Sequence, residues 1–183
     1  PSSVTSIGGG AFQGCSGLTS IVSEIENPFA INNSVFEGIP SNATLIVPRG
    51  KTSIYHSTAG WNKFTSPHIA ESSGKCGDNV YFSYDGVTHT LTFSGEGEIE
   101  IWDFLENDTR PWRLFCKEIR SIVIESGVTS LGDWAFADCH SLTSVTIPSS
   151  VTTIGDCAFK DCSGLTSVII PNGVIMIGDY EFG

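Results

Sequence analysis

The sequence predicts a mainly β, α+β solenoid in which two short arrays of roughly 23-residue repeats are separated by a cap and a small β-rich segment. Three observations predict this fold class. The phrase V-T-x-[IL]-G-D-x-x-F-x-x-C-x-x-L-T-S-V-x-I-P occurs at 128–148 and again at 151–171. A related copy, VTSIGGGAFQGCSGLTSI, occupies 4–21. The chain also contains 20 glycines, an abundance typical of many turns.

The repeat positions recur at a constant spacing of 23 residues, which separates Val128 from Val151 and Cys139 from Cys162. A unit of this length cannot bury enough apolar surface alone, so neighbouring units must stack. The stretch L-T-S-V-T-I predicts a strand that points its leucine, valine and isoleucine inward and its last threonine outward. Successive strands are therefore expected in a parallel ladder about 4.8 Å apart.

Residues 1–71 are expected to form the first array and its C-terminal cap. The segment 39–64 departs from the repeat and predicts a strand, a Pro-Arg-Gly turn and a short helix with Tyr55, Trp61 and Phe64. An open solenoid end leaves strand groups unpaired and apolar surface in water. We therefore expect these aromatic side chains to fold over that end.

Residues 72–118 are expected to be a linker and a small β-hairpin segment that caps the next array. Tyr84-Asp85-Gly86 predicts a turn between strands near 80–84 and 89–94, with a third strand near 98–102. A short helix or turn at 110–119 is expected to plug the array. Residues 119–183 form the second array, and both chain ends fall inside a repeat, which indicates a piece of a longer protein.

Composition and motifs exclude several classes of function. The net charge is −11, and the nine Lys and Arg residues are scattered, which argues against nucleic acid and anionic membrane as partners. Since no apolar run approaches the ~20 residues of a membrane span, we expect no membrane insertion within this chain. The H-E-x-x-H and G-x-S-x-G motifs are absent, as is a phosphate loop before a helix. The sequence therefore predicts no catalytic residues and no cofactor.

The six cysteines invite a test for disulfides and metal sites. Cys15, Cys139 and Cys162 share one repeat phase and are expected to form a column of small buried thiols. A disulfide between the last two is the alternative, although side-by-side neighbours fit its dihedral poorly. Cys76 and Cys116 flank the middle segment and are either bridged or free. Because no C-x-x-C pair occurs, the cysteines predict no zinc site.

Aspartates also recur in phase, with Asp133, Asp156 and Asp179 in one column and Asp138 and Asp161 in another. Stacked carboxylates could hold calcium through their oxygen atoms. They could equally be turn residues that accept hydrogen bonds from main-chain N–H groups.

Two sets of surface residues are candidates for ligand binding. The first holds outward strand positions, which form a flat polar face for a protein or a glycan, or merely a soluble β surface: Thr143, Ser144, Thr146, Thr166, Ser167 and Ile169. The second is a lateral aromatic patch of Trp134 and Tyr180, with Trp102 as a further exposed candidate, because binding hot spots favour Trp and Tyr. Its alternative is aromatic side chains that only close a turn.

The apolar positions L-x-x-V-x-I, followed by V-x-x-I-G-x-x-A-F-x-x-C, resemble those of the BspA-like leucine-rich-repeat proteins, over about residues 1–71 and 119–183. The usual leucine-rich repeat has an asparagine where this chain has Ser150, so the asparagine ladder is absent. The segment V-P-x-G…Y…G-W-x-x-F resembles the cap that ends such arrays. The module C-G-D-N…L-T-x-S-G-x-G…P-W resembles one that precedes them in bacterial surface proteins.

This resemblance implies an extracellular or cell-surface protein in adhesion or ligand binding. The predicted function is a non-catalytic surface or secreted leucine-rich-repeat module that recognises an extracellular or host protein, or a glycan. The alternative is a structural spacer that displays other domains of a larger surface protein. Since each array has only about two to three repeats, weak end-to-end self-association is also expected.

Overall fold

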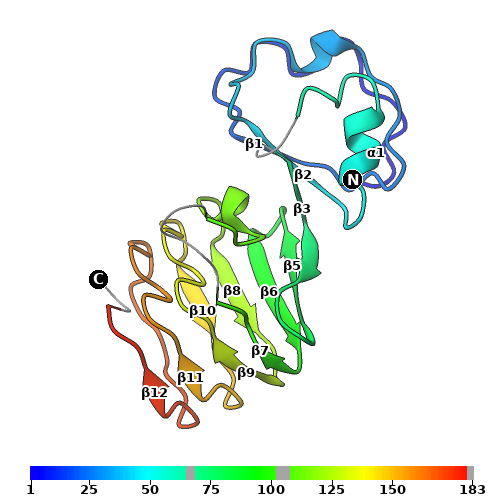
Figure 1. Cartoon of the computed structure of the whole chain (residues 1–183). Coiled ribbons are helices and arrows are strands. Elements are labelled where there is room, and N and C mark those ends of the chain that lie inside the picture. The colour runs from blue at the N-terminus through cyan, green and yellow to red at the C-terminus, as the bar shows by residue number, and fades with distance from the viewer. Residues whose placement is uncertain (65–68, 102–107, 181–183) are drawn as a thin grey trace. The chain divides into compact units, whose positions relative to one another are not determined.

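The computed structural model describes residues 1–64, 69–101 and 108–180, and the chain divides into two compact units, residues 1–72 and 73–183 (Figure 1). Short strands joined by turns and loops recur in both units, which confirms the predicted strand-rich repeat solenoid. The finer division at residues 72 and 119 stays a prediction. Within the described residues, no helix has the length and apolar character needed to cross a bilayer.

The first unit is built on a three-stranded parallel sheet in the order β1-β2-β3. β1 (Ser20–Val22) pairs with β2 (Thr44–Val47), which pairs in turn with β3 (Ile69–Glu71). A 3-10 helix at Asn33–Phe36 separates the first two strands, and the Asn32 side chain caps it by accepting a hydrogen bond from the Ser34 N–H at 2.9 Å.

The cap of the first unit has the predicted short helix, α1 (Thr52–Ser57), followed by buried aromatic residues. Phe36 lies between two of them, with ring centroids 5.5 Å from Trp61 and 5.3 Å from Phe64. The Tyr55 hydroxyl donates to the Ile25 carbonyl at 2.9 Å, which satisfies its polar end. These aromatic side chains are buried, and their role as the cap of the array stays a prediction.

In the second unit, a five-stranded sheet has the order β10-β8-β6-β5-β4. Its strands are β4 (Ser73–Lys75), β5 (Val80–Asp85), β6 (Thr90–Gly95), β8 (Ser121–Ile124) and β10 (Ser144–Thr146). β5 and β6 form the predicted antiparallel hairpin, whereas β6, β8 and β10 run parallel. The hairpin therefore continues the sheet of the repeats.

A four-stranded parallel sheet in the order β12-β11-β9-β7 completes the second unit. It consists of β7 (Gly97–Glu98), β9 (Val128–Leu131), β11 (Thr153–Ile154) and β12 (Met176–Ile177). The register places Leu131, Ile154 and Ile177 side by side, as the 23-residue spacing predicts. The third strand of the middle segment ends at Glu98, earlier than expected, and part of its predicted range lies outside the described residues.

The core of the second unit contains a column of aromatic rings. Phe136 lies 5.4 Å from Phe93 and 5.2 Å from Phe159 between ring centroids, and all three are buried. Trp112, just before the 3-10 helix Arg113–Phe115, covers Phe93 at 5.0 Å. The expected plug at 110–119 thus places its tryptophan on the end of the phenylalanine column.

The cysteine column is only partly as predicted. Cys139 and Cys162 are buried, but Cys15 is exposed, so its predicted burial is wrong. Buried thiols need a rung on each side, whereas Cys15 belongs to the first rung of its unit. No disulfide joins any of the six cysteines, so neither the Cys76–Cys116 nor the Cys139–Cys162 bridge is present.

Candidate functional site

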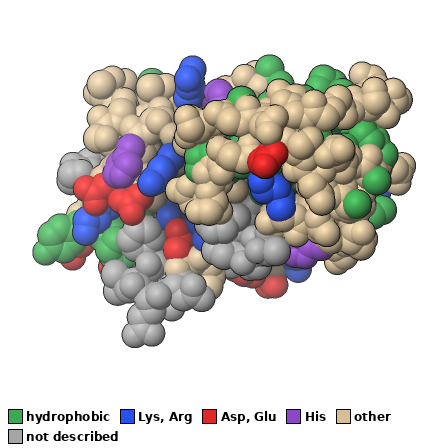
Figure 2. All heavy atoms as spheres, turned by 90° about the horizontal axis from the view of Figure 1, so that it is seen from above, with side chains coloured by type: hydrophobic (Ala, Val, Ile, Leu, Met, Phe, Trp, Pro, Cys, Tyr) green, Lys and Arg blue, Asp and Glu red, His purple; other side chains and the backbone are tan. Residues whose placement is uncertain are grey.

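The first set of predicted binding residues lies at the β10 end of the five-stranded sheet and on the repeat that follows it. All six are exposed, three on or beside β10 and three on the next repeat: Thr143, Ser144, Thr146, Thr166, Ser167 and Ile169. Uncharged side chains and main chain make up most of the molecular face seen in Figure 2, in keeping with the low charged fraction of 16%. Whether these six residues bind a ligand stays a prediction.

The structure extends this face onto the hairpin. The register places Thr90 of β6, Ser121 of β8 and Ser144 of β10 in one row across the sheet. Thr92 and Thr146 flank Val123 in the next row. We call these two rows, with the adjoining Thr143, the hydroxyl face. The β6 and β8 residues were not among the predicted binding residues, although the alternation T-L-T-F in β6 was a signal for them.

The hydroxyl groups of this face are partly engaged within the sheet. Ser144 Oγ donates to Ser121 Oγ at 3.1 Å, and Thr143 Oγ1 donates to the Arg120 carbonyl at 2.9 Å. A hydroxyl has one donor and two acceptor lone pairs, so these bonds leave acceptor capacity toward solvent. The bonds also fix the rotamers, which lowers the entropy lost when a partner binds.

The second predicted set, the lateral aromatic patch, is less uniform than its repeat phase suggests. Tyr180 is 79% exposed, but Trp134 is half-buried beneath the Lys160 ammonium, 5.1 Å from its ring centroid. Cys157 stands between them in the same phase and is buried. Trp102 lies outside the described residues. The two described aromatic residues are therefore separated by a buried thiol in their column.

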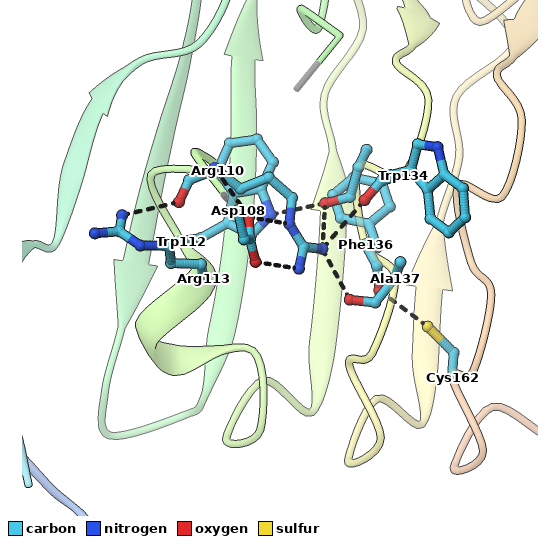
Figure 3. A network of polar contacts seen from close by, with 9 residues as sticks. Asp108, Arg110, Trp112, Arg113, Trp134, Phe136, Ala137 and Cys162 are labelled. Atoms are coloured by element: carbon cyan, nitrogen blue, oxygen red, sulfur yellow. Dashed lines mark hydrogen bonds and ion pairs between the residues drawn. The ribbon is translucent and has the colours of Figure 1, made fainter. Parts of the chain in front are cut away.

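A buried arginine holds the turn that carries Trp134 (Figure 3). Arg110 is 1% exposed and pairs with Asp108, with Nη2 2.7 Å and Nε 2.9 Å from the carboxylate oxygens. Its Nη1 donates to the carbonyls of Trp134 at 3.1 Å and Ala137 at 2.8 Å. Burial disfavours the charged form, but the hydrogen bond and charge of Asp108 raise the pKa of Arg110 above its ordinary value.

This arrangement indicates a structural role for Arg110. Its fork of donors satisfies main-chain carbonyls at the turn and a carboxylate at once, which a single buried polar atom could not do. A plug was predicted in this segment, but Arg110 was not singled out, because nothing in R-P-W-R distinguishes a buried arginine from an exposed one.

A groove of about 760 Å³ lies on the four-stranded sheet. None of its described lining residues is Lys or Arg. Five of them are acidic: Asp78, Glu98, Glu100, Asp133 and Asp156. Only Asp133 and Asp156 share a repeat phase, so no pattern in the sequence predicts that the other three acids lie beside them. The strand order explains the meeting, because β7 is the neighbour of β9.

The aspartate column bonds to the main chain of the next rung. Asp133 Oδ1 accepts the Asp156 N–H, and Asp156 Oδ1 accepts the Asp179 N–H, each at 2.9 Å. A Cβ at Gly155 would lie 2.4 Å from Asp133 Oδ1, so the ladder requires a glycine beside it. The described residues include no group of three or more His, Cys, Asp or Glu that could hold a metal ion. The geometry thus matches the hydrogen-bonding interpretation of this column.

The chain matches a protein-family model over most of its length. The model of the BspA type leucine rich repeat region matches in six copies, over residues 1–99 and 114–183. A comparison with the curated proteins finds no match.

Solved structures of bacterial repeat proteins are similar to this chain. A leucine-rich repeat protein from Eubacterium ventriosum is 30% identical with a TM-score of 0.52, over 58% of this chain and 27% of that one. A leucine rich cell surface protein from Faecalibacterium prausnitzii is 28% identical with a TM-score of 0.33, over 57% of this chain and 32% of that one. The chain thus spans about a third or less of the length of either structure.

Proposed function

The chain belongs to the BspA-type leucine-rich-repeat family, and from that premise we propose that it is a non-catalytic surface or secreted module that mediates adhesion by binding an extracellular or host protein. The observation that carries the proposal is the hydroxyl face. It is a flat sheet surface with hydroxyl side chains from three adjacent strands, β6, β8 and β10.

Small hydroxyl side chains suit recognition of a partner by close approach. They let a second main chain come near the sheet, and each offers a donor or an acceptor to it. The face also has few long side chains to immobilise, so the entropy lost on binding is small. Because these residues carry no charge, the affinity should depend only weakly on salt.

Surface plasmon resonance tests the proposal. The 183-residue chain is passed over immobilised extracellular-matrix proteins and, separately, over glycans. We expect saturable binding to a protein and its loss in Thr146→Arg, which places a long charged side chain on β10, the end strand of the face. Thr152→Arg is the matched control, because Thr152 is also exposed but precedes β11 of the other sheet.

The outcomes separate the alternatives. Binding to glycans alone would change the partner class from protein to carbohydrate. The absence of saturable binding to both would favour a spacer that displays other domains. If Thr146→Arg leaves binding intact and Trp134→Ala and Tyr180→Ala weaken it, the lateral aromatic patch replaces the hydroxyl face as the site.

A further inference from the structure

A third buried cysteine belongs to the column that Cys139 and Cys162 form. Cys116 precedes Cys139 by 23 residues, as Cys139 precedes Cys162, so the three cysteines share one repeat phase. Their main-chain turns match as well, because the N–H of each donates to the carbonyl three residues before it, at 3.5, 3.2 and 3.2 Å in chain order. We call Cys116, Cys139 and Cys162 the thiol column. The segment predicted as a plug therefore carries the first member of this column.

Side chains of the plug contact the turn that leads into Cys139. Trp112 Nε1 donates a hydrogen bond to the Ala135 carbonyl at 2.8 Å. Arg110 Nη1 donates to the Ala137 carbonyl, also at 2.8 Å. Both donors are nearly or fully buried, so these bonds are shielded from competition with water. The plug is thereby held on the first repeat of the thiol column.

The hydrogen bonds of the thiols select one pair within the column. The Cys139 side chain hydrogen-bonds the Cys116 side chain, which brings the two sulfur atoms into contact. Cys162 Sγ instead donates to the Phe136 carbonyl at 3.2 Å, and Figure 3 shows this bond. The Cys162 sulfur is therefore engaged by the main chain, whereas Cys116 and Cys139 face each other.

We propose that Cys116 and Cys139 are a redox pair, which a small-molecule disulfide converts into a covalent bridge between the plug and the repeats. Disulfides form and persist outside the cell, so this modification suits the proposed surface or secreted location. A metal shared by the column is not supported, because the part of the chain that the structure describes has no group of three or more His, Cys, Asp or Glu suited to one. The bridge goes beyond the proposed function, because it needs no binding partner.

The reaction consists of two thiol–disulfide exchanges. Cys116, which is 4% exposed, attacks the small disulfide as a thiolate, and its sulfur bonds to one half while the other half leaves as a thiolate. Cys139, which is 0% exposed, then attacks the Cys116 sulfur from within the protein and displaces the second half. Two protein thiols are thus oxidised to one disulfide. The small disulfide is reduced to two thiols, which take up the two protons.

The bridge stabilises the second unit. It joins two residues 23 apart in the sequence, and closing such a loop removes conformations from the unfolded chain. It also fastens the segment whose Trp112 ring covers Phe93 at 5.0 Å. Oxidation therefore locks the plug onto the repeats, and reduction releases it.

Oxidation with glutathione disulfide at pH 8 tests the proposal on the full chain carrying Cys15→Ser, which removes the exposed thiol. The remaining thiols are alkylated, the chain is digested with trypsin and chymotrypsin, and linked peptides are identified by mass spectrometry. We expect a single link, between Cys116 and Cys139. The Tm of the second unit should be about 10 °C higher than in the reduced chain, and dithiothreitol should reverse both changes.

Two further variants form a matched pair, because serine keeps a hydrogen-bond donor at either position of the thiol column. Cys116→Ser should abolish the link and the rise in Tm, whereas Cys162→Ser should keep both. The link is mapped without these variants, so the test stays decisive if one of them fails to fold. A link through Cys162 or Cys76 would overturn the proposal, as would no link in the folded chain or a link that leaves the Tm unchanged. The test involves no binding partner, so the redox pair and the proposed binding function can fail independently.

Discussion

The two units build the same turn from different residues. In the first repeat the left-handed positions are Gly10 and Gly14, with φ of 72° and 73°. The equivalent positions of the second unit are Trp134 and Asp138, with φ of 58° and 62°. In the next repeat, a cysteine and an aspartate occupy these two positions, also with a left-handed φ. The left-handed conformation therefore costs the second unit about 1–2 kcal/mol per residue, a cost that glycine avoids. The conformation of the turn is therefore determined by stacking of the repeats and not by which residue occupies the position.

Main-chain bonds to the following rung explain how the turn persists. The N–H of Gly14 donates to the Glu37 carbonyl at 2.8 Å, and the N–H of Asp138 donates to the Lys160 carbonyl at 3.0 Å. Because both bonds require the left-handed conformation, the neighbouring rung holds a non-glycine residue in it. The side chains at the left-handed positions can therefore differ from repeat to repeat, as Trp134 and Tyr180 do.

The largest expected effect separates a central rung from an end rung. Phe136→Ala should lower the free energy of unfolding of the second unit by about 3–5 kcal/mol, because it empties the middle of the ring column. The equivalent Phe12→Ala should cost only about 1–2 kcal/mol, since Phe12 is 38% exposed. Urea unfolding at low protein concentration measures both. Equal losses would contradict the view that the first rung is open on its outer side.

Arg110 stabilises one unit in a way that has no described counterpart in the other. Arg110→Ala should cost about 3 kcal/mol, because the Asp108 carboxylate and the carbonyls of the Trp134–Ala137 turn lose their partner. Arg110→Lys should recover less than half of that loss, since an ammonium cannot reproduce the fork of bonds. Thermal unfolding followed by circular dichroism measures the series. Full recovery by lysine would show that charge alone matters at this site.

The contrast between the units also shows what a sequence can reveal. The 23-residue spacing was sufficient to predict the parallel ladder, the inward leucines and the burial of Cys139 and Cys162, because each follows from stacking identical units. The burial of Cys15 was wrongly predicted, because the 23-residue spacing does not show whether a repeat lies at the end or in the middle of an array. A first rung lacks the neighbour that covers its thiol, and a phase shared with Cys139 cannot reveal that.

Strand pairings between segments that do not occupy equivalent positions in the repeat could not be predicted from the sequence. The β5–β6 hairpin was predicted, but nothing in its pattern shows that β6 pairs with β8 and extends the hydroxyl face to Thr90 and Thr92. The acidic groove depends in the same way on β7 lying beside β9. Such pairings arise from the three-dimensional order of strands. The binding role of the candidate residues stays a prediction.

Thiol reactivity should divide the two units at one repeat position. At pH 8 we expect a thiol reagent to label Cys15 quickly and Cys139 and Cys162 only on unfolding. Burial raises the pKa of Cys162 and of Cys76 to about 12, from an ordinary value of 9.0. Counting reacted thiols by mass spectrometry tests this. Rapid labelling of Cys139 in the folded chain would contradict the buried column.

The same raised pKa values predict a loss of stability at alkaline pH. A thiol that stays neutral in the folded state but ionises when unfolded contributes its full stabilisation below pH 9, and that contribution falls as the pH rises toward 12. The free energy of unfolding of the second unit should therefore decrease from pH 9 upward, measured by urea unfolding. Cys162→Ala should make that decrease shallower, whatever its effect at pH 7.

The smallest effects test the turn itself. Gly14→Ala should cost about 1 kcal/mol, because alanine is strained at a φ of 73° although no atom lies within 4 Å of the added Cβ. Gly17→Ala, also with open space and without a left-handed φ, should instead stabilise the unit by about 0.4–1 kcal/mol. Asp138→Ala should lose less than Gly14→Ala, since the second unit already bears a side chain there. A larger loss of stability in Asp138→Ala than in Gly14→Ala would contradict this view. It would show that the Asp138 side chain makes a specific stabilising contact, and that the turn does not simply accept any residue there.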